Sequence, residues 1–310
     1  MERFSWFFYR LQSMTAAEII HRARERALIL LERIRFHSPF IDRGAPSYKK
    51  LHPGRIEGIR DLDQKRNRML EYFPAQQSHL LQKADHILAH QFEFFSMDFH
   101  FPGDINWHRD PITGREWPGV FYHDLDTREG QQYGGVKWIW ELNRHHHLVT
   151  LGKVYHLTGD KKYARGVCSQ LESWIEANPP LMGVNWTSPL ELAVRLLNWS
   201  WALGFIQDSE ALTGELKQRI HRSVCQQAHH IRRHLSAYSS ANNHLIGEAA
   251  GLAVVGLTFP DLPDADKWRD TGLGILEREI ERQIHPDGVP AEQAVHYLAF
   301  ILDLNLFTWL

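Results

Sequence analysis

Apolar residues recur at helical spacing along most of the chain, without the sustained period-two alternation of a half-buried strand. A first helix is predicted over 15–36 with Thr15 as its cap, and a second over about 76–92. Residues 37–74 are interrupted by Pro and Gly and are predicted to be irregular. Later helices are predicted over 137–158, 160–177, 188–207, 211–237, 241–258, 265–284 and 290–310. Short turns pack successive helices as antiparallel hairpins, so we predict an all-α fold that suits a toroid of helical hairpins.

The segment 96–135 is a long stretch rich in Pro and Gly between the predicted helices. A loop of this length inside a compact domain is usually functional or disordered. Disordered segments contain few aromatic residues, whereas this one holds Phe99, Phe101, Trp107, Trp117, Phe121, Tyr122 and Tyr133. We therefore expect it to be ordered and functional.

Composition narrows the function classes. The 310 residues include 35 Lys and Arg against 37 Asp and Glu, and this near-neutral balance argues against a nucleic-acid partner. The 20 His and 11 Trp are residue types that a carbohydrate groove uses, although a core also uses the aromatic ones. Two cysteines cannot build a disulfide framework, and no apolar stretch is long enough for a membrane span. Arg3 and Arg10 interrupt the apolar start too early for a signal-peptide core, which predicts a cytoplasmic protein, with a periplasmic one as the alternative.

The predicted helix over 188–207 is mostly apolar but carries a polar stripe. Glu191, Arg195 and Asn198 stand at positions i, i+4 and i+7, on one helical face. Buried charge must be paired or must face a wet cavity. Two interpretations follow: a surface ion pair between Glu191 and Arg195, or a groove-lining stripe in which Arg195 meets an anion.

Two further segments place polar groups on apolar helices. Asn243 and His244 fall in the first turn of a helix capped by Ser240 or Asn242, where unpaired N–H groups favour a carboxylate. Glu248 follows His244 by four residues and is predicted to orient its ring. The alternative is a capping Asn beside a surface His.

The last of these segments begins at the turn Asp287-Gly288. Pro290 suits the first helical position. On that helix Gln293 and Tyr297 are four apart, and a neighbouring stripe holds Glu292, His296 and Asp303. The alternative is a buried Tyr with one hydrogen-bond partner and a satisfied core His.

The sequence contains no familiar metal or cofactor spacing. His145, His146 and His147 are consecutive, so on a helix they point in different directions and cannot share one ion. HExxH, CxxC, GxGxxG and P-loop spacings do not occur. The basic residues between 217 and 234 are interpreted as a solvated helix rather than a binding patch. We expect no cofactor and no metal in this domain.

Four motifs in order resemble the N-terminal domain of the heparinase II/III-like polysaccharide lyases. They are WIWELNRHHHLVTLGKVYHLTGD from Trp138, ELAVRLLNWSWAL from Glu191, NNHLIGEAAGL from Asn242 and DGVPAEQAVHYLAFILDL from Asp287. The resemblance implies N-terminal helices over 1–94 and an incomplete α/α toroid over 95–310. It also implies a following β-sandwich, absent here, which could hold a structural metal. The chain stops inside an apolar helical run, so we expect it to be truncated.

The resemblance also implies β-elimination at a uronic acid of an acidic polysaccharide, such as a glycosaminoglycan, alginate or bacterial exopolysaccharide. Asn243 and His244 match the position that neutralises the substrate carboxylate, and Tyr297 matches the tyrosine that acts as base, acid or both. Substrate contacts are expected from Trp138, Glu191, Arg195, Asn198, Glu248, Glu292, Gln293 and His296, with stacking on the aromatic segment 96–135. Many relatives carry a His soon after the Tyr, where this chain has Leu298 and Ala299, and another His comes from the β-sandwich. The fragment alone is therefore expected to bind substrate without turning it over.

Two alternatives stay open on the sequence. A toroidal glycoside hydrolase would use paired carboxylates such as Glu248 and Glu292 and would leave a saturated product. A non-catalytic glycan-binding scaffold in polysaccharide biosynthesis would bind polymer without cleaving it. The oligomeric state is left open.

Overall fold

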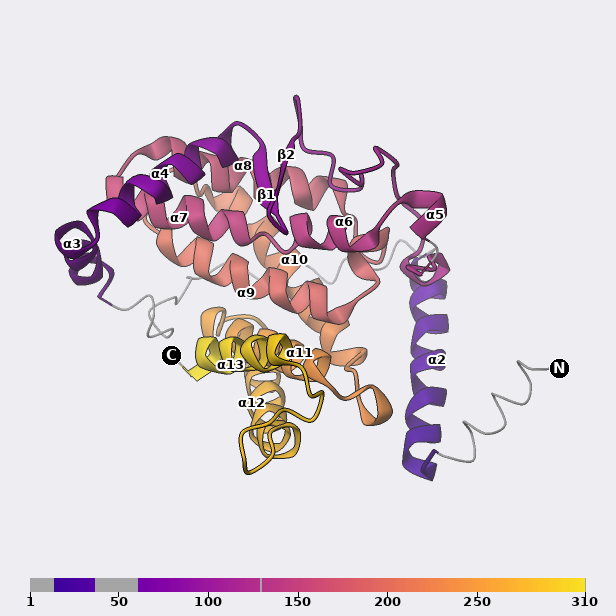
Figure 1. Ribbon diagram of the computed structural model, residues 1–310. Coiled ribbons are helices and arrows are strands. Elements are labelled where there is room, and N and C mark those ends of the chain that lie inside the picture. Colours follow the sequence, from indigo (N-terminus) through magenta and orange to yellow (C-terminus); the bar gives the residue numbers. More distant parts are fainter. Residues whose placement is uncertain (1–13, 37–60, 129, 310) are drawn as a thin grey trace.

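A computed structural model describes residues 14–36, 61–128 and 130–309, and most of this part is helical (Figure 1). Helix α2 (Ala16–Phe36) starts as predicted, because the Thr15 hydroxyl accepts a hydrogen bond from the Glu18 N–H at 3.2 Å. The region predicted to be irregular lies outside the described residues over 37–60, but its last part forms helix α3 (Leu62–Tyr72). That part of the prediction is wrong. Helix α4 (Pro74–Leu88) follows directly, with Pro in its first turn.

A small hairpin is the strand structure that the sequence pattern did not indicate. Strands β1 (Gln91–Phe94) and β2 (Met97–His100) pair antiparallel, with Phe92 opposite Phe99. Each strand has four residues, which is too short for a sustained alternation.

The long segment after the hairpin is ordered, as predicted, and includes η4 (Tyr122–Asp124) and α5 (Gly130–Tyr133). Most of its aromatic rings belong to the core rather than to a stacking surface. Those less than a tenth exposed are Phe101, Trp107, Trp117, Phe121 and Tyr122.

The helix predicted over 137–158 is broken in two. Helix α6 (Val136–Asn143) ends before α7 (His146–Thr158), and between them His145 has a φ of 63°. That left-handed conformation cannot continue a helix. The His145 ring is fully buried, and its Nδ1 accepts a hydrogen bond from Trp199 Nε1 at 2.7 Å.

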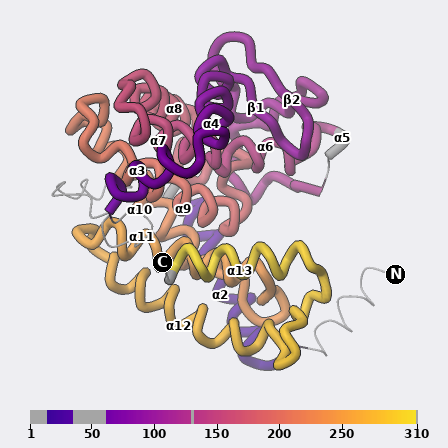
Figure 2. Tube along the Cα trace, turned by 60° about the vertical axis from the view of Figure 1, so that its left-hand side comes forward, coloured from indigo at the N-terminus to yellow at the C-terminus, as the bar shows by residue number. Residues whose placement is uncertain are grey.

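The remaining helices stack as successive hairpins (Figure 1). They are α8 (Lys161–Ala177), α9 (Pro189–Phe205), α10 (Gly214–Arg233), α11 (Asn243–Thr258), α12 (Ala265–Gln283) and α13 (Val295–Trp309), with short 3₁₀ turns η5 (Val184–Trp186) and η6 (Tyr238–Ser240). Helix α9 packs against α7, α10 and α11, and α11 packs against α12 and α13 (Figure 2). Close crossings need glycine: a Cβ on Gly272 would lie 2.4 Å from the Ala249 carbonyl oxygen. The predicted incomplete α/α toroid is confirmed. In the described residues no helix is long and apolar enough to cross a membrane.

Candidate functional site

The N-terminus of α11 holds a carboxylate. The Asn242 side chain caps the helix by accepting a hydrogen bond from the His244 N–H at 2.9 Å. Asn243, only 5% exposed, donates from its amide nitrogen to both carboxylate oxygens of Glu292, at 2.9 and 2.7 Å, and from its backbone N–H at 3.2 Å. The sequence predicted a carboxylate-binding helix start here, and within the chain that carboxylate belongs to Glu292.

Glu292 reaches Asn243 because α13 begins later than predicted. Pro290 forms an isolated bridge with Ile284, and Gln293 has a φ of 51°, so the helix starts only at Val295. Glu292 and Gln293 therefore precede the helix, and the predicted stripe from Glu292 to His296 does not form.

The first turn of α13 presents its polar side chains to solvent. Tyr297 is 46% exposed, so the alternative of a buried tyrosine is wrong. His296 beside it and Gln293 before the helix are exposed as well. Among the described residues no hydrogen bond to the Tyr297 hydroxyl is formed, which leaves this group open to a ligand.

Arg144 is a site residue that the sequence reasoning missed. Its guanidinium makes a bidentate ion pair with Glu191 at 2.7 and 2.9 Å and a further bond to Glu141 at 3.0 Å. Glu191 is buried, and Arg144 is about a quarter exposed. The predicted pair between Glu191 and Arg195 is therefore wrong. No local pattern links Arg144 to Glu191, because the two residues are 47 positions apart in the sequence.

Arg195 is a core residue, in contrast to the predicted groove contact. It is fully buried, donates to the Asn143 carbonyl oxygen at 2.7 Å and to Gln227 Oε1 at 2.9 Å, and lies over the Trp174 ring at 4.3 Å. These bonds join α9 to the end of α6 and to α10. In this arrangement Arg195 has no exposed atom with which to meet an anion.

We expect Arg195→Met to lower the free energy of unfolding by about 3–5 kcal/mol, because buried acceptors lose their charged partner. Arg219→Met is the matched control: that guanidinium pairs with Glu172 and Glu176 near the surface, so the loss should stay below about 1 kcal/mol. Urea unfolding of both variants measures the difference, and equal losses would contradict the structural role of Arg195.

Asn198 and His146 lie beside the ion pair between Arg144 and Glu191. Asn198 Nδ2 donates to the Arg144 carbonyl oxygen at 2.8 Å and lies 3.1 Å from His146 Nδ1. His146 and Glu141 line a cavity of about 530 Å³ between α4, the hairpin and α7. Trp138 packs edge-on against Phe99, another residue of its lining. His147 lines the same cavity, and its ring centroid lies 5.4 Å from that of the fully buried His145.

His244 feels the charge of Glu292 and also the charges of the Arg144–Glu191 pair. Its ring is exposed, and its pKa is lowered, first by partial desolvation and also by Arg144, while Glu191 and Glu292 oppose the shift. The structure thus places His244 within electrostatic reach of both carboxylates. Direct contacts join Asn243 to Glu292 and Arg144 to Glu191.

Glu248 does not orient His244, in contrast to the prediction. It is fully buried and accepts hydrogen bonds from the Ser236 N–H at 2.7 Å and from the Ser236 hydroxyl at 2.8 Å. Burial raises its pKa to about 8, and the two bonds from Ser236 limit the shift. Glu248 therefore fixes the turn that precedes α11 rather than contacting a ligand.

The raised pKa of Glu248 makes stability depend on pH. Between its ordinary pKa of 4.5 and about 8, the folded state keeps a proton that the unfolded chain releases, so stability falls as pH rises. We expect Glu248→Gln to remove this contribution of about 1 kcal/mol per pH unit. The measurement compares urea unfolding of both proteins at several pH values across that window. Parallel pH profiles would contradict the assignment.

The fold and the site together define a helical-toroid protein in which the start of one helix holds a carboxylate. Residues 60–308 match the model of the Heparinase II/III N-terminus, and the chain belongs to this family.

Curated relatives agree with this assignment. A heparin-sulfate lyase of Pedobacter heparinus is 29% identical over 231 residues, covering 72% of this chain and 31% of the relative. A heparin-sulfate lyase of Bacteroides thetaiotaomicron is 31% identical over 194 residues, covering 57% of this chain and 27% of the relative. The chain therefore spans about a third or less of the length of these two relatives.

Solved structures show the same fold. The crystal structure of heparan sulfate lyase HepC from Pedobacter heparinus superimposes with a TM-score of 0.58 at 28% identity, covering 74% of this chain and 34% of that one. A crystal structure of Heparinase III covers 92% of this chain and 39% of its own at a TM-score of 0.54, and at 21% identity it supports the fold alone.

Proposed function

We propose that this chain is the toroid part of a polysaccharide lyase that cleaves a uronate-containing glycosaminoglycan by β-elimination. The observation that carries the proposal is the N-terminus of α11, where the amide and backbone N–H of Asn243 hold a carboxylate. The substrate carboxylate takes the place that Glu292 occupies within the chain. His244 stands beside it as a second donor.

The chemistry needs this neutralisation because the reaction builds negative charge next to a carboxylate. Removal of the C5 proton leaves an electron pair that forms the C4–C5 double bond while the C4–O4 bond breaks. Donors aimed at the carboxylate stabilise the charge that develops on it. Tyr297, exposed and with an open hydroxyl, takes part in the proton transfers at C5 and at the leaving O4.

The substrate class is proposed from the relatives, whose names are heparin-sulfate lyases. The cavity beside Glu141 and His146, with Arg144 next to it, supplies polar groups for further sugar units. The comparisons do not support alginate or bacterial exopolysaccharide as the substrate.

The structure argues against the glycoside hydrolase alternative, because one of the two carboxylates that it requires is buried. Glu248 is fully buried against Ser236, and Glu292 is bound to Asn243, so the two are not a pair across an open groove. The scaffold alternative is distinguished by experiment rather than by this geometry.

The test uses the full-length protein and a panel of uronate polymers that includes heparan sulfate. Elimination creates an unsaturated uronate, so we expect ultraviolet absorbance to rise in step with new reducing ends. New reducing ends without a rise in ultraviolet absorbance would show that the protein is a glycoside hydrolase rather than a lyase. Binding without either signal would support the glycan-binding scaffold.

A further inference from the structure

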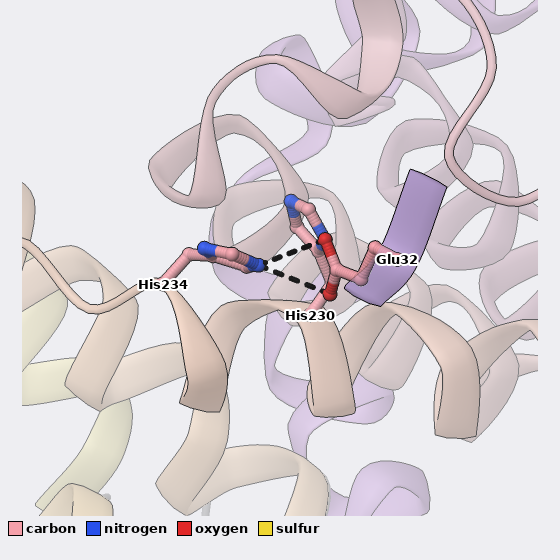
Figure 3. Close-up of side chains that lie close together, drawn as sticks. All are labelled: Glu32, His230 and His234. Carbon is pink, nitrogen blue, oxygen red and sulfur yellow. Dashed lines mark hydrogen bonds and ion pairs between the residues drawn. The ribbon is translucent and has the colours of Figure 1, made fainter. Parts of the chain in front are cut away.

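Three side chains from distant parts of the chain converge on one point away from the candidate active site. Glu32 comes from α2, and His230 and His234 come from the end of α10 (Figure 3). One ligand atom of each lies within 4.8 Å of the others. His234 Nε2 is 3.1 Å from both oxygens of the Glu32 carboxylate.

The two histidines are four residues apart, so they share one face of α10. Their ring centroids are 4.6 Å apart, and the exposed fractions of Glu32, His230 and His234 are 6%, 3% and 9%. His230 Nδ1 is buried and has no hydrogen-bond partner among the described residues. Figure 3 shows one nitrogen of the His230 ring facing the carboxylate and the other pointing away. Hydrogen bonds within the cluster therefore leave one buried nitrogen unsatisfied.

The protonation states suit metal binding. Burial lowers the pKa of His230 to about 3, and His234 acts in the same direction. Burial alone would raise the pKa of Glu32, but the hydrogen bond with His234 lowers it below its ordinary value. A neutral imidazole and an ionised carboxylate are the forms that ligate a metal.

Outer hydrogen bonds hold two of the three side chains. The Tyr122 hydroxyl donates to Glu32 Oε2 at 3.0 Å, and the backbone of Trp186 bonds to the His230 ring. Such second partners orient ligands at metal sites. Arg233 lies 3.8 Å from Glu32 Oε1, but its side chain is 41% exposed and can turn to solvent.

We propose that Glu32, His230 and His234 bind a divalent transition-metal ion, with zinc the best fit, and that this ion fastens α2 to α10. Two imidazoles and one carboxylate are a ligand set that zinc accepts, whereas magnesium and calcium prefer oxygen ligands throughout. Among the other polar contacts of α2, Arg22 bonds to Ser240 at 2.9 Å from a side chain that is 33% exposed. Since the three ligands are buried, the ion has a structural role, and this inference is independent of the proposed activity.

The test titrates the full chain, freed of metal by a chelator, with Zn²⁺ by calorimetry and with Co²⁺ by visible absorption. We expect one equivalent of each ion to bind, and Co²⁺ to show the bands of a low-coordinate nitrogen and oxygen site. Glu32→Gln and His230→Gln should weaken binding by about 100-fold or more, and Tyr122→Phe by about 10–100-fold. His229→Gln is the matched control, since His229 is on the same helix but faces Asp264 at 3.4 Å.

Absence of saturable binding by the natural chain would overturn the site, and this result does not depend on any variant folding. Binding that His230→Gln and His229→Gln reduce equally would overturn it as well. Hydrogen exchange tests the structural role: Zn²⁺ should slow exchange of the α2 amides by about tenfold or more. Tight binding with unchanged exchange in α2 would show that the ion does not fasten this helix.

Discussion

Asn243→Ala is expected to lower the rate of uronate elimination by about 100- to 1,000-fold. The amide of Asn243 donates to a carboxylate at 2.7 and 2.9 Å from the start of α11, and alanine removes this donor while the helix remains. Loss of one aimed donor to a developing anion has an effect of this size. Because the interaction strengthens as charge develops, kcat should fall more than KM rises.

The matched control is Asn242→Ser. Serine also caps helices well, so the N–H of His244 keeps a side-chain acceptor. This variant should retain activity within a few-fold. If both variants lose activity together, the loss reflects the helix start rather than the amide, and the carboxylate-binding role of Asn243 is wrong.

The ends of α7 and α8 were predictable because apolar spacing meets a strong stop at both places. The segments around Thr158-Gly159-Asp160 and Asn178-Pro179-Pro180 end helices by local chemistry alone, and the structure ends α7 and α8 there. The toroid follows from short turns between such helices. Local signals were therefore sufficient for the helical hairpins after α7, but not for α3, the small β-hairpin or the break at His145.

The site was predictable only where one segment contains its own signal. Asn243 was predicted because the residue before it, Asn242, is a helix-capping residue. The partner of Glu191 was not found, since Arg144 is 47 residues away in the sequence. Arg195 was misplaced because a polar stripe on an apolar helix is equally compatible with a groove and with a buried hydrogen-bond network.

The basic residues between 217 and 234 also show that a local pattern does not reveal a distant partner. His221, His230 and His234 are buried rather than solvated, which corrects the prediction of a solvated helix at these positions. Two histidines four residues apart do not indicate a metal site by themselves. They do so only when a third ligand is known to lie beside them. Glu32 lies 202 residues before His234, so no local pattern connects them.

Tyr297→Phe is expected to lower kcat for elimination by about 100- to 10,000-fold, with little change in substrate affinity. Phenylalanine keeps the ring on the first turn of α13 but cannot transfer a proton, and this is the contribution of a positioned acid or base. Since Tyr297 is 46% exposed and its hydroxyl makes no hydrogen bond within the described structure, the substitution should not destabilise the fold.

Steady-state kinetics on heparan sulfate and equilibrium binding of the same polymer separate these effects. Tyr238→Phe is the control, because Tyr238 is a tyrosine of similar exposure, 41%, that packs against His21 rather than at the start of α13. It should keep full activity. If Tyr297→Phe loses affinity and kcat in proportion, the side chain only binds sugar, and the proton transfers must be assigned to other groups. If it keeps its kcat, Tyr297 has no part in the elimination, and the open hydroxyl on α13 is a surface feature.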